Sequence, residues 1–137
     1  MENELRALVL RYAAAVDDRA FDRLAMVFTP DAVLDTGRAV RSGLDEIRSA
    51  MEGLHRYEST DHRVGESAFR PEPDSDATRA AGVVACEAHH VGVVDGQRVD
   101  RVMVIEYQDS YVVTDAGWRI ATRRLVLLRE DVIDLQG

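Results

Sequence analysis

The sequence has little cysteine, little proline and no long apolar run, and each shortage excludes a class of protein. Cys86 is the single cysteine, so no disulfide can form within the chain and no paired-cysteine metal or redox site is present. No apolar segment approaches the ~18 residues that span a membrane, and the acidic N-terminus lacks the basic region of a signal peptide. We therefore expect a soluble, cytoplasmic protein with no membrane partner.

Positive charge is also in short supply. The chain has 17 basic and 25 acidic residues, which gives a net charge of -8, and such a chain repels phosphate backbones. We therefore expect no nucleic-acid partner. With 137 residues, of which 46% are apolar and 31% charged, the composition is that of one globular domain spanning residues 1–137.

The first part of the chain has helical periodicity. Apolar residues recur every three or four positions from Leu5 to Val16, with Asn3 as a possible cap. Pro30 is expected to stop a second short helix, and Ser42-Gly-Leu-Asp45 resembles a capping box that opens a third. The predicted helices cover residues 3–17, 21–28 and 42–54, and residues 32–35 are predicted to be extended.

The remainder of the chain is typical of β-strands. Residues 71–76 and 115–117 are predicted turns, and Asp95-Gly96 is the strongest hairpin signal. The predicted strands cover residues 62–70, 79–95, 99–114 and 118–128, followed by a loose tail or subunit contact at 129–137. Helices followed by strands indicate the α+β class, with three helices packed on one face of a curved, mainly antiparallel sheet.

Two acidic residues, Asp17 and Asp18, end the first predicted helix, where the negative end of the helix dipole disfavours a carboxylate. Both could be solvated turn residues. A residue that breaks a local rule is nevertheless a candidate for function, and Tyr12 lies on the buried stripe of the same helix.

Histidines supply the second candidate group. His89 and His90 are adjacent on a predicted strand and must point to opposite faces. Glu87 shares a face with His89, so we expect His90 to face the interior. His62 opens the first predicted long strand, from which it could reach a pocket between helices and sheet or remain a surface histidine.

An aspartate beside a histidine has a clear chemical use. The carboxylate fixes the imidazole tautomer and stabilises the imidazolium, so that the other ring nitrogen can act as a general base. A tyrosine hydroxyl in the same pocket can polarise a carbonyl group. The chain contains no metal-ligand spacing, phosphate-binding loop, dinucleotide fingerprint or nucleophile motif, so we expect no metal and no cofactor.

Six segments in order, YAAAVD, DRAFDRL, FTPDAVLD, GLDEI, TDHRVG and DAGWRI, resemble the SnoaL-like domain of the nuclear transport factor 2-like superfamily. The resemblance covers nearly the whole chain and implies a cone-shaped α+β barrel. It is nearest to the branch of scytalone dehydratase, hexachlorocyclohexane dehydrochlorinase and bile-acid dehydratase. This branch implies an Asp17–His62 catalytic dyad, with Tyr12 and His90 as substrate-binding residues.

The resemblance implies a cofactor-independent lyase or isomerase that abstracts a proton from a small hydrophobic, oxygenated substrate. The alternatives are a polyketide cyclase-type isomerase and a non-catalytic ligand-binding or assembly module. Thr36, Ile105 and Tyr107 replace polar pocket residues of scytalone dehydratase, and Arg124 either reaches the pocket or forms a surface ion pair. Apolar residues on both faces of the 99–114 strand predict a homo-oligomer, a trimer or a dimer.

Overall fold

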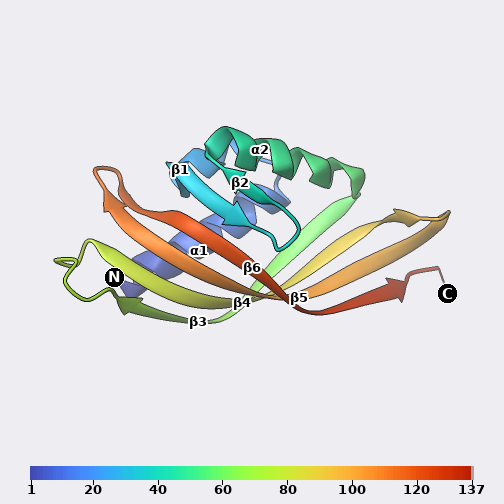
Figure 1. Ribbon diagram of the computed structural model, residues 1–137. Coiled ribbons are helices and arrows are strands. Elements are labelled where there is room, and N and C mark those ends of the chain that lie inside the picture. The colour runs from blue at the N-terminus through green and yellow to red at the C-terminus, as the bar shows by residue number, and fades with distance from the viewer. Residues whose placement is uncertain (137) are drawn as a thin grey trace.

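The computed structural model describes residues 1–136 and shows helices held in the concave side of a curved sheet (Figure 1). The helical elements are α1 (Glu2–Asp17), the 3-10 helix η1 (Phe21–Met26), α2 (Leu44–Glu52) and the 3-10 helix η2 (Gly53–Arg56). The strands are β1 (Phe28–Asp35), β2 (Val40–Ser42), β3 (Ser59–Pro71), β4 (Arg79–Val94), β5 (Gln97–Thr114) and β6 (Gly117–Asp134). The predicted α+β class is confirmed. No helix within residues 1–136 is long and apolar enough to cross a membrane.

The six strands form one open sheet in the order β2-β1-β6-β5-β4-β3. Every neighbouring pair is antiparallel except β1 and β6, which are parallel. In Figure 1 the C-terminal ends of β4 and β6 and the N-terminal end of β5 extend beyond the helices, so that part of the sheet has no helical cover. This uncovered stretch adjoins the cavity described below.

Helix α1 supplies one side of the core. Its buried stripe repeats at helical spacing and contacts β3 and β6. The buried residues of this stripe are Leu5, Leu8, Val9, Tyr12, Ala13, Ala15 and Val16. They pack against the inward residues of β4, β5 and β6, which include Val84, Cys86, Ile105, Tyr107 and Ile120.

Two predicted helix caps are wrong. Asn3 lies inside α1, which begins directly after Met1 without a side-chain cap, while the carboxylates of Glu2 and Glu4 favour the positive end of the helix dipole. Helix α2 follows Gly43, whose φ of 89° is open to glycine and strained for other residues, and Asp45 makes no capping bond. Its neighbour Glu46 accepts a 3.2 Å hydrogen bond from the Ser42 N–H instead.

The prediction that Pro30 ends a helix is wrong. The second helical segment is the 3-10 turn η1, which ends at Met26, and Pro30 lies within β1. The pairing of β1 with β6 shifts between Phe28 and Val33. Proline is tolerated there because the interrupted ladder does not require its missing N–H.

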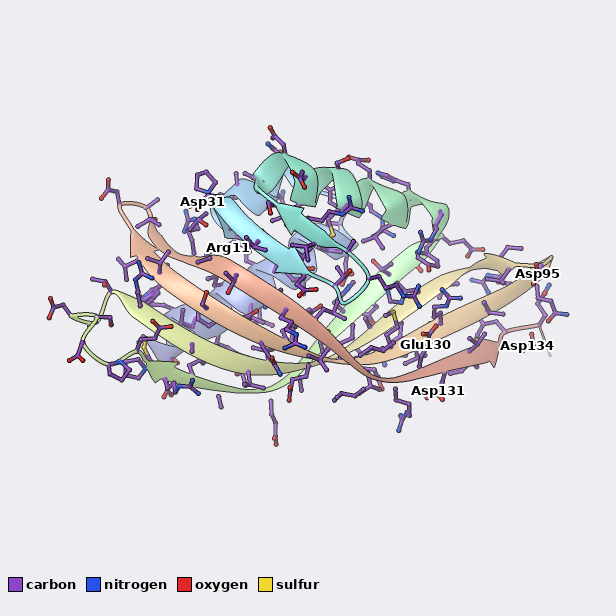
Figure 2. All side chains as sticks on the ribbon, in the orientation of Figure 1. Arg11, Asp31, Asp95, Glu130, Asp131 and Asp134 are labelled. Carbon is purple, nitrogen blue, oxygen red and sulfur yellow. The ribbon has the colours of Figure 1, made fainter. Side chains whose placement is uncertain are left out.

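Strand β6 is longer than predicted. Its pairing with β5 continues to Asp134, so residues 129–134 are not a loose tail, and the alternative of a subunit contact stays a prediction. Gly137 lies outside the described residues. Glu130 and Asp131 project from opposite sides of this extension (Figure 2). Val132 and Ile133, which are 59% and 48% exposed, give the extension an apolar surface.

A bulge in β6 changes which arginine faces the core. Tyr111 pairs with Ile120 and Ser110 pairs with Thr122, so one residue of β6, Ala121, has no partner on β5. The alternation shifts by one position beyond it. Arg123 is therefore buried, at 1% exposure, while Arg124 is exposed and does not line the cavity.

Candidate active site

The end of helix α1 positions Asp17 through a Schellman motif. Arg19 adopts a left-handed φ of 57°, the N–H of Ala20 donates to the Ala15 carbonyl at 2.9 Å, and the N–H of Arg19 donates to the Val16 carbonyl at 3.1 Å. The Arg19 guanidinium also donates to the Val16 carbonyl at 2.9 Å. A cation thus offsets the negative helix end that had made Asp17 unexpected there.

Asp17 is held by three hydrogen bonds from β3. Its Oδ1 accepts from the Thr60 hydroxyl at 2.9 Å and lies 2.7 Å from His62 Nδ1, and its Oδ2 accepts from the His62 backbone N–H at 2.7 Å. Burial acts to raise the pKa of Asp17, but the hydrogen bonds from His62 and Thr60 outweigh it and hold the pKa below its usual value. Asp17 is therefore ionised at neutral pH.

This contact fixes the tautomer of His62. A carboxylate can only accept, so the Nδ1–H of His62 donates to Asp17, and in the neutral ring the Nε2 atom carries the free lone pair. The two side chains are 20% exposed for Asp17 and 8% exposed for His62. The arrangement can hold a proton on Nε2, because the adjacent carboxylate stabilises the imidazolium that forms.

His62 faces a cavity of about 270 Å³ between α1, α2, η2 and the inner face of the sheet. Most of its lining is apolar, which suits a small ligand with a hydrophobic body. The apolar and aromatic lining residues are Tyr12, Val16, Leu34, Ala50, Met51, Leu54, Tyr57, Met103, Ile105, Tyr107, Leu125 and Leu127. The polar lining residues are Thr36, Arg38, Arg56, His62, His90, Arg101 and Glu130.

His90 lines this cavity, and His89 does not. The His90 and His62 rings meet edge to face with centroids 5.9 Å apart. Nδ1 of His90 lies 3.0 Å from the Arg101 carbonyl, which can only accept, so neutral His90 also presents a bare Nε2. Burial lowers the pKa of His90 and keeps it neutral at pH 7.

Tyr12 lines the cavity from α1 and rests on a buried ion pair. Arg123 lies 4.5 Å from the Tyr12 ring centroid and 3.9 Å from that of Tyr107. The Arg123 guanidinium donates to both carboxylate oxygens of Asp109, at 2.8 and 2.7 Å. Burial raises the pKa of Tyr12, with Arg123 acting in the opposite direction. The phenol therefore stays protonated and can donate a hydrogen bond.

The structure thus brings together all four residues singled out from the sequence, Tyr12, Asp17, His62 and His90. Sequence reasoning missed Thr60. It could have been found, because it lies two residues before His62 and side chains two residues apart on a strand share a face. It also missed Arg19, whose guanidinium donates to the Thr60 hydroxyl at 2.7 Å and to the Leu54 carbonyl at 3.2 Å. No sequence signal marks a non-glycine residue as a helix terminator.

Comparison with known proteins identifies the family. Residues 1–124 match the SnoaL-like domain, so the chain belongs to the SnoaL-like domain family, within the nuclear transport factor 2-like superfamily. An uncharacterized protein of Mycobacterium tuberculosis, Rv2910c, is 34% identical over 125 residues, which cover 88% of this chain and 80% of that protein.

Solved structures share the fold at lower identity. A hexachlorocyclohexane dehydrochlorinase, LinA-type3 from Novosphingobium barchaimii, superposes with a TM-score of 0.83 at 16% identity, covering 96% of this chain and 89% of that one. A candidate scytalone dehydratase from Novosphingobium aromaticivorans has a TM-score of 0.83 at 19% identity, covering 95% of this chain and 85% of that one. At such identities the likeness establishes the fold alone.

Proposed function

We propose that this protein is a cofactor-independent lyase or isomerase in which His62 removes a proton from a carbon atom next to a carbonyl group. One observation carries the proposal. The Asp17 carboxylate and the His62 imidazole are 2.7 Å apart, and His62 presents its free nitrogen to a mostly apolar cavity. A neutral imidazole backed by a carboxylate is a general base suited to neutral pH.

In the elimination we propose, Nε2 of His62 takes the proton from the carbon between the carbonyl group and the carbon that bears the leaving group. The C–H electron pair becomes the new C=C bond, and the bond to the leaving oxygen breaks. The proton held on Nε2 passes to that oxygen, which departs as water. Without a leaving group, the same proton returns at another carbon, which is an isomerisation.

Tyr12 and His90 take different parts in this scheme. The protonated phenol of Tyr12 can donate to the carbonyl oxygen on which negative charge develops. Neutral His90 has its Nδ1–H engaged by the Arg101 carbonyl, so its Nε2 can only accept. We therefore propose that His90 accepts a hydrogen bond from a substrate hydroxyl and orients it beside His62.

Two considerations favour an enzyme over a ligand-binding or assembly module. An assembly module has no need of an open cavity, and neither kind of module needs a dyad within hydrogen-bond distance, yet this chain has both features. The names of the two similar structures, a dehydrochlorinase and a candidate scytalone dehydratase, both denote eliminations. A polyketide cyclase-type isomerase would use the same pocket and would differ in the substrate.

Two small ketones that fit the cavity test the proposal. 3-Hydroxy-1-indanone loses water to give 1-indenone, followed by absorbance, and 1-indanone exchanges its C2 protons for deuterium, followed by NMR. We expect Asp17→Asn to lower both rates by about 10² to 10⁴-fold, the usual contribution of a general base and its support. Asp18→Asn is the matched control, because Asp18 is the adjacent, exposed acid and should leave the rates unchanged.

The folded state of each variant is checked by circular dichroism and by its urea midpoint. A ketone that perturbs the NMR signals of cavity residues, yet reacts equally fast with wild type and Asp17→Asn, would contradict the assignment. Equal losses in Asp17→Asn and Asp18→Asn would point to general surface charge rather than to the dyad.

We also propose that the protein self-associates as a trimer or a dimer. The support is the apolar surface left on the sheet, where Leu128 and Val93 are 61% and 63% exposed. Size-exclusion chromatography with light scattering tests this, and a monomer at micromolar concentration would contradict it.

A further inference from the structure

The cavity lining is basic in an acidic protein. The chain carries 25 acidic and 17 basic residues, whereas three arginines and a single glutamate line the cavity. The arginines come from different segments: Arg38 from the connection between β1 and β2, Arg56 from η2 and Arg101 from β5. A local reversal of the overall charge indicates a site for a ligand of the opposite sign.

Only one of these arginines is neutralised. Arg101 forms a 3.0 Å ion pair with Glu130, the acidic residue of the lining. Arg38 forms no ion pair with any residue in the described part of the chain. Arg56 packs over the Tyr57 ring, 4.9 Å from its centroid, and donates to the Tyr57 hydroxyl at 3.2 Å. Two guanidinium groups therefore border the cavity without an acidic partner.

The two ends of the cavity differ in exposure and in charge. Arg38 and Arg56 are exposed, whereas Tyr12 and His90 are 4% and 6% exposed. Asp17 is ionised behind His62 and would repel an anion placed against the dyad. A ligand with one anionic end would therefore place that end at the exposed arginines and its apolar body toward the histidines.

We propose that the ligand of this cavity is an apolar molecule bearing one carboxylate-like anionic group, which Arg38 and Arg56 bind at the cavity mouth. The inference rests on the proposed function and adds the substrate class to it. A guanidinium donates in a planar fork that matches a carboxylate. The ring of Tyr57 supports the Arg56 guanidinium from below, which limits the side-chain entropy lost when the anion binds.

Two probes of nearly equal shape isolate the charge: 2-naphthoate and 2-naphthamide, whose affinities are compared by isothermal titration calorimetry. We expect the wild type to bind the naphthoate about tenfold more tightly, since two partly exposed charge contacts give an effect of that order. Raising the salt concentration should reduce the difference, because exposed charges are screened.

Matched double variants assign this preference to the two arginines. Arg38→Gln/Arg56→Gln should bind both probes with equal affinity. Arg23→Gln/Arg41→Gln removes the same charge from two exposed arginines that do not line the cavity, and it should retain the wild-type preference. Asp17→Asn should also retain it, so loss of catalysis and loss of the anion site are separate results.

Four results would overturn the inference. The wild type could bind the amide as tightly as the naphthoate, or bind neither probe at millimolar concentration. The preference could persist in Arg38→Gln/Arg56→Gln. Equal loss of the preference in Arg23→Gln/Arg41→Gln would assign it to net charge and would likewise contradict a site at the cavity mouth.

Discussion

The two faces of strand β4 place the same side chain in opposite environments. His90 faces the cavity, where burial lowers its pKa and its Nδ1–H donates to the Arg101 carbonyl. His89, one residue earlier, faces outward between two carboxylates, 2.6 Å from Asp100 and 2.9 Å from Glu87. Hydrogen bonds to Asp100 and then Glu87 raise the pKa of His89.

The difference shows that the strand face, rather than the residue type, determines the chemistry. An outward histidine with both ring nitrogens at carboxylates is an imidazolium and has no free lone pair. An inward histidine whose only partner is a carbonyl is neutral and keeps one lone pair for a ligand. At these two positions of β4, the inner face therefore supplies a hydrogen-bond acceptor and the outer face supplies a paired charge.

The largest difference between the faces is expected for ion pairs. Arg123→Met removes the partner of buried Asp109, whose side chain is 0% exposed, and should lower the free energy of unfolding by about 3–5 kcal/mol. Arg129→Met, which removes the partner of exposed Asp131 on the outer face, should change it by less than about 0.5 kcal/mol. Urea denaturation followed by circular dichroism measures both.

A second variant shows whether the loss arises from the unpaired charge. Asp109→Asn/Arg123→Met leaves no ionised group at the site and should recover part of the stability that Arg123→Met loses. A loss below about 1 kcal/mol in Arg123→Met would mean that Asp109 is readily solvated or protonated, against the burial described above.

Glycine substitutions test packing on the two faces. A Cβ at Gly82, on the inner face of β4, would lie 2.7 Å from a Phe69 ring carbon and 2.9 Å from a Tyr111 ring carbon, so Gly82→Ala should destabilise by about 1–3 kcal/mol. At Gly65 the nearest atom is the Ala85 Cβ, at an ordinary 3.4 Å. Gly65→Ala should be neutral or stabilise by up to about 1 kcal/mol. Thermal unfolding distinguishes them, and equal effects would contradict the packing difference.

The smallest expected effect is a pair of opposite pH dependences. An imidazole in the unfolded chain titrates near pH 6.5. The folded pKa of His90 is lower, so its contribution to stability is present above pH 6.5 and is lost as the pH falls through the folded pKa. The folded pKa of His89 is higher, so its contribution is full below pH 6.5 and is lost as the pH rises through that pKa.

Urea midpoints between pH 5 and 9 measure this pair, as differences between wild type and each of His90→Gln and His89→Gln. The His90 difference should shrink toward acid, and the His89 difference should shrink toward base. If both differences shrank in the same direction of pH, the two histidines would experience the same surroundings.

Much of the fold could be predicted because local chemistry determines it. The apolar stripe of α1, the Asp95-Gly96 hairpin and the alternation along β4 are each visible within one segment. The β6 extension could not be predicted, since its residues pair with Val99 to Val104 from a distant segment. The helix caps failed for a related reason: side chains that could cap are common, and which of them does so depends on tertiary position.

The site was partly predictable. Parity places His90 rather than His89 inward, and the resemblance carries Tyr12, Asp17 and His62. Arg38 and Arg56 gave no signal, because an arginine in a connection is usually a solvated surface residue. What makes them notable is a shared cavity, and only the folded chain reveals that convergence.

Two residues of β6, Ala121 and Leu128, have no partner on β5, and the alternation of inward and outward side chains shifts by one position at each of them. If Ala121 were instead paired with Ser110, each later residue would move by one partner, and Arg124 rather than Arg123 would face the inner side of the sheet. Deletion of Ala121, by contrast, would leave Arg123 opposite Asp109, because the residues after the bulge would keep their partners on β5. The register at the bulge, rather than the chemistry of the side chains, therefore decides which of two neighbouring arginines lies beneath the cavity.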